Sequence, residues 1–325
     1  MRAIVHHEFG DPAQVLGVEE VPLPEPGPRE VRLRVLLSPI HNHDLWTIRG
    51  TYGYKPELPA RAGTEAVGIV DALGDDVEGI ELGQRVATGG AFGAWAEYVI
   101  AKAGALVPVP DGIPDKAAAQ LVAMPFSAIS LVEFLDLHDG DVIVQNAANG
   151  AVGRLVAQIG ASRGIRVIGI VRRQTDVGAL AEADIPDVVA TDDHAWRDRV
   201  PELAGDRPIV AAVDSVGGTA SGDLLDLLGE GGTLVSFGAM ASERMELSSG
   251  DLIFKQAVVK GFWGSKVSAA MSAETRRVLF AELFHLIGSG RLTLPVDSVH
   301  SIDDVRAAVA ASGRAGRVGK VLLRP

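Results

Sequence analysis

The pattern of apolar and polar positions changes near residue 118. Before this point, short runs of apolar and β-branched residues are separated by turns rich in Gly and Pro, which is typical of an all-β or barrel-like unit. The expected strands of this part are Met1–His7, Val31–Leu37, Glu65–Leu73, Arg85–Thr88 and Trp95–Ile100, the last with Tyr98 in the core. This half of the chain therefore reads as strands and loops.

From about Pro114, apolar strands alternate with amphipathic segments of helical length. This pattern is typical of a parallel sheet with both faces covered by helices. The expected strands are Asp141–Gln145, Arg166–Val171, Asp187–Ala190, Ile209–Asp214, Thr233–Gly238 and Ala257–Phe262. Six such strands fit one doubly wound, Rossmann-type nucleotide-binding domain in an α/β protein.

The last sixty or so residues return to a mixed pattern. They predict a helix at Glu274–Ser289, an extended piece at Leu292–Val296, a helix at Ile302–Ala311 and a strand at Lys320–Arg324. Such a tail can pack on the N-terminal unit. We therefore expect a discontinuous β-rich domain of residues 1–117 and 264–325, interrupted by a Rossmann domain of residues 118–263.

Composition narrows the chemistry. The chain has no Cys, which excludes disulfides, thiolate zinc sites, iron–sulfur clusters and Cys nucleophiles. A formal net charge of -12 argues against nucleic acid or an anionic membrane as partner. No apolar run approaches the roughly 18 residues needed to span a bilayer, and no leader is visible, so we expect a cytoplasmic protein. Hydrolase and kinase motifs are also lacking.

A strand, a small-residue turn and a helix follow one another at Asp141–Ile159. Ala147, Gly150 and Gly153 have the three-residue spacing of a Rossmann turn, in which small residues let the backbone approach a pyrophosphate. A plain tight turn is the alternative. Because the turn stands at the head of a series of alternating strands and helices, we interpret it as a dinucleotide site.

The residues after the second strand of this series indicate which dinucleotide binds. An NAD site usually has an acidic residue there, whereas this chain has Arg172 and Arg173 followed by Gln174. Guanidinium groups suit a 2′-phosphate, so NADPH is favoured over NADH. The alternative is a solvated pair of loop arginines.

The segment His41-Asn42-His43-Asp44 suggests a metal site, because residues i and i+2 of a strand share a face. A catalytic zinc needs three protein ligands, and no thiolate is available to complete the set. We therefore expect no metal, and interpret these polar residues as lining the mouth of a pocket.

Tyr52 and Tyr54 lie in a Gly-flanked loop soon after the histidine segment. A phenol on a loop can act as a general acid toward a developing enolate or alkoxide. A loop tyrosine is more often an amphipathic packing residue, and the residues alone leave both interpretations open.

Over essentially its whole length the chain resembles the zinc-free branch of the medium-chain dehydrogenase/reductase superfamily. The resemblance is carried by Gly63-Thr-Glu-Ala-Val-Gly68, Gly93-Ala-Trp-Ala-Glu-Tyr98, Val107-Pro-Val-Pro-Asp-Gly112 and the Rossmann turn. It implies a Rossmann domain combined with a GroES-like catalytic domain. Thr64 stands where zinc-dependent members have His, in agreement with the absence of Cys.

Within that branch the chain is most similar to the 2-enoyl thioester reductases of mitochondrial type. Matching segments are Ser38-Pro-Ile40, Ile48-Arg-Gly-Thr-Tyr-Gly53, Pro56-Glu-Leu-Pro59 and Gln145-Asn-Ala-Ala-Asn149. The resemblance implies that NADPH delivers a hydride to the β-carbon of an α,β-unsaturated thioester. Tyr52 would then donate a proton to the resulting enolate, which makes it the catalytic residue.

The resemblance also assigns the remaining site residues. The cofactor residues are Asn149, Gly150, Ala151, Val152 and Gly153 at the pyrophosphate, Arg172, Arg173 and Gln174 at the 2′-phosphate, Phe237, Gly238, Ala239, Met240, Phe262, Trp263 and Gly264 at the nicotinamide, and Lys320 near the cofactor or substrate cleft. The substrate-pocket residues are His41, His43, Tyr54 and Met124. Met124 replaces the usual Asn of the family, and the two histidines replace an Asn and a small residue.

These departures lie at the substrate end and leave other functions open. A quinone or enone could accept the same hydride, which makes an NADPH:quinone or enone oxidoreductase the alternative. A cofactor-binding protein without turnover is a third hypothesis, since fold alone does not imply function. The apolar strand Ala257–Phe262 could pair across a two-fold axis, as in many relatives, so we also expect a homodimer.

Overall fold

The computed structural model describes residues 1–325, which form two compact units. The first unit comprises Met1–Ala123 and Thr293–Pro325, and the second comprises Met124–Leu292. The second unit therefore extends past residue 264, where the sequence places the domain boundary. The reason is that α11 (Ala273–Gly288) packs on α4 (Met124–Phe134), with the rings of Phe126 and Phe280 stacked at 4.4 Å.

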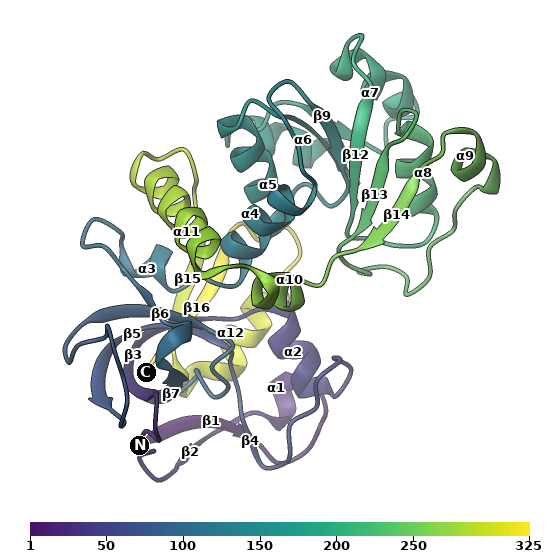
Figure 1. The fold of residues 1–325 in the computed structure, drawn as a ribbon. Coiled ribbons are helices and arrows are strands. Elements are labelled where there is room, and N and C mark those ends of the chain that lie inside the picture. The colour runs from purple at the N-terminus through teal and green to yellow at the C-terminus, as the bar shows by residue number, and fades with distance from the viewer. The chain divides into compact units, whose positions relative to one another are not determined.

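The first unit is built on two sheets (Figure 1). Its strands are β1 (Arg2–His6), β2 (Gly17–Glu20), β3 (Glu30–Pro39), β4 (Ala60–Arg61), β5 (Glu65–Leu73), β6 (Arg85–Gly89), β7 (Tyr98–Lys102), β8 (Val107–Pro108), β15 (Val296–Ser301) and β16 (Lys320–Arg324). One sheet has the order β2-β1-β4, and the other has the order β15-β16-β3-β5-β6-β8, with β7 paired to β3. All pairs are antiparallel except β15 with β16.

Short helices close the ends of these sheets. They are α1 (Pro12–Val15), α2 (Asn42–Arg49), α3 (Asp115–Ala118) and α12 (Val305–Ser312), with single 3-10 turns at η1 (Ala103–Ala105) and η2 (Ile302–Asp304). Ile48 of α2 and Val309 of α12 pack with Trp95 in one apolar cluster. Gly63 is required beside it, because its φ is +91° and a Cβ would meet the Trp95 ring at 2.2 Å.

Two details of the first unit differ from the sequence prediction. The expected extended piece at residues 292–296 is displaced: β15 begins at Val296 and runs to Ser301. Tyr98, expected in the core, is half-buried at the start of β7, with the guanidinium carbon of Arg32 5.8 Å from its ring centroid. Both segments mix apolar with polar residues, so their hydrophobic pattern is weak.

The second unit contains a six-stranded parallel sheet in the order β11-β10-β9-β12-β13-β14. The strands are β9 (Val142–Gln145), β10 (Arg166–Val171), β11 (Val188–Ala190), β12 (Ile209–Asp214), β13 (Thr233–Ser236) and β14 (Val258–Gly261). This is the order of a doubly wound sheet, with the reversal between β9 and β12. The predicted fold class and all six predicted strands are confirmed.

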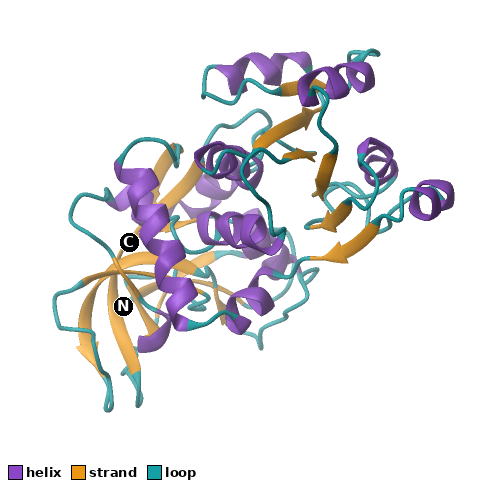
Figure 2. Ribbon diagram, turned by 45° about the horizontal axis from the view of Figure 1, so that its top comes forward, coloured by secondary structure: helices purple, strands orange, loops and turns teal.

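Helices flank this sheet (Figure 2). Besides α4 and α11 they are α5 (Ala151–Ser162), α6 (Gln174–Ala181), α7 (Trp196–Ala204), α8 (Thr219–Leu227), α9 (Ser249–Phe254) and α10 (Gly264–Ala270). Trp196 of α7 and Leu224 of α8 pack against Val144 and Ile168 of the central strands. Strands covered in this way must be apolar on both faces, which explains their near-continuous apolar sequences. No helix of either unit has the length and apolar character needed to cross a membrane.

Candidate active site

The loops that follow β9, β10, β12, β13 and β14 leave the same edge of the parallel sheet, because the carboxyl ends of parallel strands coincide. Ligands of such sheets bind outside this edge, where the strand order reverses. All predicted cofactor residues of the second unit lie on these loops or on the helix turns that follow them: Asn149, Gly150, Ala151, Val152, Gly153, Arg172, Arg173, Gln174, Phe237, Gly238, Ala239, Met240, Phe262, Trp263 and Gly264.

The turn between β9 and α5 is shaped for close approach of an anion. Ala147 has a φ of +49°, and its carbonyl accepts a hydrogen bond from the N–H of Gly150 at 2.8 Å. A Cβ on Gly153 would stand 2.8 Å from the Ala147 oxygen and the Ala148 Cα, so only glycine fits there. Helix α5 has no acidic residue in its first turn. Its free N–H groups and its dipole therefore suit a phosphate.

The two arginines after β10 are exposed. The Arg173 Nε lies 3.4 Å from an Asp176 carboxylate oxygen, and the N–H of Gln174 donates to Asp192 at 3.1 Å. The sequence analysis did not single out Asp192, which follows the neighbouring strand β11. The surface next to the arginines is therefore mixed in charge. Arg173 is paired with a carboxylate, whereas Arg172 is not.

The loops after β13 and β14 pack on each other. The rings of Phe237 and Phe262 stack at 5.7 Å, and the Phe262 N–H donates to Ser236 O at 2.9 Å. Phe262 is buried, whereas Trp263 is 61% exposed and has Lys266 Nζ 4.7 Å from its ring centroid. Stacked aromatic rings thus connect the loops after β13 and β14 at this edge of the sheet.

A buried carboxylate that the sequence analysis missed ties these loops together. Asp214, at the end of β12, accepts hydrogen bonds from Asn146 Nδ2 at 2.6 Å and from Ser221 Oγ at 2.5 Å. It also accepts from the N–H groups of Val216 and Gly217 at 2.9 and 3.1 Å. The Asp214 carbonyl accepts from two further N–H groups in the loop after β13. Asp214 therefore supports the loops after β9, β12 and β13, at the edge of the sheet where the predicted cofactor residues lie.

In the first unit, the histidine segment forms a helix start and not a strand. His41 is the N-cap of α2, and its backbone N–H donates to the Asp44 carboxylate at 2.9 Å. Such a bond between the cap and the third helical residue stabilises a helix N-terminus. The expectation of a strand was wrong, because an Asp three residues after the cap favours a helix. The i, i+2 argument for a shared face does not apply here.

His41 is fully buried and does not line a pocket mouth, in contrast to the expectation. Its Nε2 lies 2.6 Å from Glu65 Oε2, and the other Glu65 oxygen accepts from the N–H groups of Val122 and Ala123 at 2.6 and 2.7 Å. Burial raises the pKa of Glu65 to about 7 and lowers the pKa of His41 well below its ordinary value. Burial thus favours the neutral forms of both Glu65 and His41. One proton lies in the hydrogen bond between Glu65 Oε2 and His41 Nε2.

Lys320, a predicted cofactor residue, lies at the start of β16 in this same unit and is 9% exposed. Burial lowers its pKa to about 8; nearby Arg317 acts in the same direction, and Glu65 and Asp44 oppose it. The charge of Lys320 therefore interacts with both His41 and Glu65. The structure places it with these carboxylates, a grouping that sequence spacing does not reveal.

Tyr52 lies over the same face of α2 as His43 and Trp46. Its ring centroid is 6.0 Å from that of His43 and 6.5 Å from that of Trp46. Tyr52 is 40% exposed, so its phenol is available to a ligand. Tyr54 is also exposed but turns elsewhere, with its ring 4.6 Å from Phe92. Met124, predicted in the substrate pocket, begins α4 in the second unit and is half-buried.

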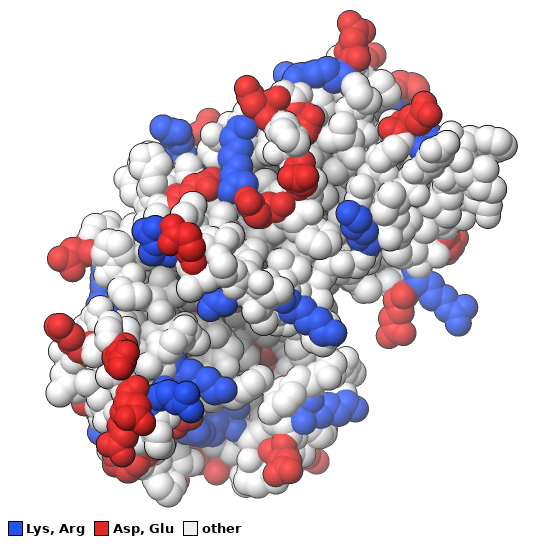
Figure 3. All heavy atoms as spheres, viewed as in Figure 1, with Lys and Arg blue, Asp and Glu red and all other residues white.

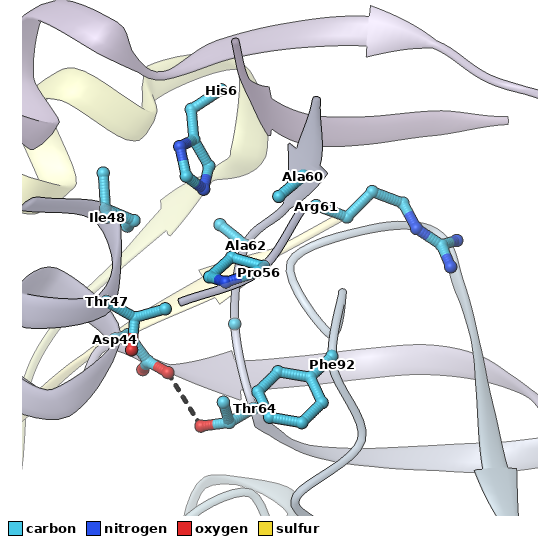
Figure 4. A pocket seen from close by; sticks show the side chains of 11 residues that line it. His6, Asp44, Thr47, Ile48, Pro56, Ala60, Arg61, Ala62, Thr64 and Phe92 are labelled. Carbon is cyan, nitrogen blue, oxygen red and sulfur yellow. Dashed lines mark hydrogen bonds between the residues drawn. The ribbon is translucent and has the colours of Figure 1, made fainter. Parts of the chain in front are cut away.

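A pocket of about 200 Å³ adjoins α2 (Figure 4). Asp44, Thr47 and Ile48 form one wall, and the segment from Ala60 to Thr64 forms another. Thr64 Oγ1 donates to Asp44 Oδ1 at 2.7 Å within it (Figure 4). Asp44 therefore bonds the N-terminus of α2, lines the pocket and lies next to His43.

The structure shows no set of side chains for the metal site that the histidine segment suggests. No three His, Cys, Asp or Glu side chains of the chain are grouped so that they could hold a metal ion. Thr64 supplies a hydroxyl that already bonds Asp44 and His43. Over the visible face, acidic and basic side chains are interspersed, without a continuous area of one sign (Figure 3).

Two family models match the chain. Residues 27–111 match the alcohol dehydrogenase GroES-like domain, and residues 151–280 match the zinc-binding dehydrogenase family. The mitochondrial enoyl-acyl-carrier-protein reductase of Homo sapiens is 36% identical over 318 residues, covering 96% of this chain and 85% of that protein.

Solved structures agree with these matches. A mycobacterial quinone oxidoreductase superposes with a TM-score of 0.90 at 28% identity, and covers the whole of both chains. The Escherichia coli quinone oxidoreductase complexed with NADPH gives 0.89 at 25% identity, again over both whole chains. The chain therefore belongs to the medium-chain dehydrogenase/reductase superfamily of oxidoreductases, in the group that contains enoyl reductases and quinone oxidoreductases.

Proposed function

We propose that the protein is an NADPH-dependent reductase that transfers a hydride to an activated C=C bond, most specifically that of a trans-2-enoyl thioester. The observation that carries this proposal is the exposed Tyr52 phenol above His43 and Trp46, in a chain 36% identical to an enoyl-acyl-carrier-protein reductase. The cofactor assignment is supported by the α5 turn and by the NADPH complex of a quinone oxidoreductase relative.

The residues of this chain divide the work as follows. NADPH, when bound, supplies the hydride. The backbone of Asn149 to Gly153 and the N-terminus of α5 hold the pyrophosphate, and Arg172 and Arg173 hold the 2′-phosphate. Tyr52 donates its Oη proton as negative charge develops on the enolate. A hydrogen-bond donor placed where this charge develops stabilises it.

Tyr52→Phe tests the proton-donor role. We expect kcat with NADPH and crotonyl-CoA to fall by about 10²-fold, the lower end of the effect of a general acid. Tyr98→Phe, a half-buried tyrosine on β7 outside the predicted site, is the matched control and should retain kcat within about twofold. Equal activity of Tyr52→Phe and the wild type would contradict the assignment.

The cofactor preference is tested separately. Arg172→Ala combined with Arg173→Ala should weaken NADPH binding by at least about tenfold and leave NADH binding nearly unchanged, because only NADPH has the 2′-phosphate. Arg207→Ala is the control, since Arg207 bonds Gly140 O before the amino end of β9. Equal losses for both cofactors, measured by fluorescence titration, would rule out a 2′-phosphate site.

A quinone or enone reductase is the second candidate, and the solved structures named above favour it. A quinone needs less from the protein, because it accepts a hydride readily and water can protonate its product. Turnover of quinones that is indifferent to Tyr52→Phe, without turnover of enoyl thioesters, would select this candidate. Tight NADPH binding without any turnover would instead select a non-catalytic role.

We also propose a homodimer formed through β14. This strand is the edge of the parallel sheet, and Val258 and Val259 on it are 42% and 39% exposed. Phe254, at the end of α9, is 84% exposed, and the surface around α9 is mostly uncharged (Figure 3). An unpaired edge with apolar side chains favours pairing with a second copy. Light scattering should show a dimer, and Val259→Lys should yield a monomer.

The cytoplasmic location stays a prediction. Several relatives carry the description mitochondrial, among them the human protein and that of Arabidopsis thaliana. Fractionation of the source cells, with the chain detected by a specific antibody, would decide between the two locations.

A further inference from the structure

The hydrogen bonds around His43 determine which of its ring nitrogens carries a proton. Thr64 Oγ1 donates its single proton to Asp44 Oδ1 at 2.7 Å. The same Oγ1 lies 2.9 Å from His43 Nε2 and can therefore only accept from it. Neutral His43 must then be the Nε2–H tautomer. Its Nδ1 lies outside this network, on a side chain that is 24% exposed.

Charged and titratable groups face His43 from several elements. On α2, Asp44 Oδ1 lies 3.6 Å from Nε2 and is the acidic group next to it, whereas burial favours the neutral form of Glu65 at the start of β5. The stacked His41 ring, 4.9 Å away, is buried and neutral and so does not repel a charge on His43. Lys320 of β16 is the opposing cation, and it interacts with both carboxylates.

Tyr52 faces His43 from the loop after α2. Their ring centroids are 6.0 Å apart, a separation that a hydrogen bond between the side chains or one bridging water can span. A tyrosine that has given its proton to an enolate is an anion, and a neighbouring imidazolium is a suitable group to restore that proton. In this arrangement the Thr64 hydroxyl and the Asp44 carboxylate hold His43, the acid, in one tautomer.

We propose that His43 is a positioning residue that returns the proton to Tyr52 after each turnover, held in place by Thr64 and Asp44. This inference rests on the proposed enoyl reductase function. When the Oη–H bond of Tyr52 breaks and the proton forms a C–H bond at the α-carbon, a tyrosinate remains. The Nδ1–H bond of the His43 imidazolium then breaks and a new Oη–H bond forms. Neutral His43 afterwards takes a proton from solvent, so each cycle consumes one proton from water and one hydride from the cofactor.

His43→Gln is the central test. The Gln amide can still donate to Thr64, but it cannot supply the proton that His43 Nδ1 gives to Tyr52. With NADPH and an enoyl thioester, kcat of the wild type should fall as the pH rises from about 5 to 8, the range in which imidazole loses its charge. His43→Gln should lower kcat about tenfold at the acid end, remove this slope and change KM little. His7→Gln, which replaces an exposed histidine bonded to Glu19, should retain the wild-type profile.

Thr64 supplies a second, independent pair of variants. Thr64→Val removes the hydroxyl at nearly constant volume and should reproduce part of the His43→Gln effect, whereas Thr64→Ser should restore the wild-type profile. Nitrogen chemical shifts of the histidine rings should show the Nε2–H tautomer of His43 in the wild type and a tautomer mixture in Thr64→Val.

These readouts separate the two hypotheses. If the wild type reduces quinones but no enoyl thioester, the proposed function fails, while the tautomer measurement still decides how His43 is held. If enoyl thioesters are reduced and His43→Gln keeps the slope with pH, the slope belongs to another group such as Glu65, and the role of His43 is overturned. An Nδ1–H tautomer in the wild type overturns it as well.

Discussion

Each unit contains a fully buried carboxylate, and the two have different partners. Asp214 in the second unit accepts from one amide, one hydroxyl and two backbone N–H groups, none of which titrates near neutral pH. Glu65 in the first unit accepts from two backbone N–H groups and faces the ring of His41. The first environment offers a complete set of fixed donors, and the second includes a titratable one.

This difference separates two uses of a buried acid. The donors around Asp214 come from several loops, so their shared acceptor holds the cofactor edge in one arrangement. The proton between Glu65 and His41 can move between the partners, and Lys320 and Asp44 bias where it resides. A buried carboxylate with fixed donors is a structural element, whereas one with a titratable partner responds to pH.

Removal of the fixed acceptor should have the largest effect. Asp214→Ala leaves four donors without a partner, three of them buried, so we expect the free energy of unfolding to fall by about 4 kcal/mol. Urea denaturation followed by circular dichroism measures it. Glu202→Ala, an exposed acid on α7, is the control and should change stability by less than about 0.5 kcal/mol. A loss for Asp214→Ala as small as that of the control would show that this network does not support the fold.

The titratable pair should be visible in the pH dependence of stability. The pKa of Glu65 is raised from 4.5 to about 7, so its contribution stabilises at low pH and is lost as the pH rises through 7. The pKa of His41 is lowered below 6.5, so its contribution is unfavourable at low pH and disappears as the pH rises through 6.5. Between about pH 4.5 and 6.5 the two slopes oppose each other in the wild type.

Single substitutions should reveal the pH dependence of stability that each of the two groups contributes. Glu65→Gln leaves only His41, so stability should rise with pH up to about 6.5, by at most about 1.4 kcal/mol per pH unit. His41→Gln leaves only Glu65, so stability should fall as the pH rises from about 4.5 to 7. The exposed pair of His7 and Glu19 is the matched control, and His7→Gln should leave the wild-type profile unchanged. Parallel profiles for all these proteins would contradict a shared proton.

The smallest expected effect compares one hydroxyl in each unit. Ser221→Ala removes a donor to a buried carboxylate and should cost about 2 kcal/mol, as for hydrogen bonds to charged groups. Ser38→Ala removes a donor to the Glu65 backbone carbonyl and should cost about 1 kcal/mol, as for neutral partners. Both serines are buried, so burial does not explain a difference. The reverse order in thermal or urea unfolding would contradict a stronger hydrogen bond to the Asp214 carboxylate than to the Glu65 carbonyl.

The second unit was the more predictable of the two. The strands from β9 to β13 are largely buried, so each appears in the sequence as an apolar run between helical segments. The turn after β9 was predicted from Ala147, Gly150 and Gly153, because the backbone there leaves no room for larger side chains. Asp214 was missed, since a single acid after a strand has no local signature.

The first unit was less predictable because its elements are short and half-exposed. The segment from His41 to Asp44 was interpreted as a strand, although the bond between the Asp44 carboxylate and the His41 N–H starts a helix. β15 was displaced because Val296–Ser301 contains polar residues that half-bury next to β16. The roles of the individual site residues stay predictions until the variants are measured.

The sequence by itself determined the class of the fold, the dinucleotide turn and the absence of thiol chemistry, because periodicity, glycine spacing and composition are local properties. Tertiary structure alone decided that His41 faces Glu65, that Lys320 lies among acids 255 residues or more before it in the chain, and that Thr64 orients His43. These contacts depend on how distant strands and helices pack. Burial then sets the charge of each group, since the free energy of an ion depends on the solvent and partners around it.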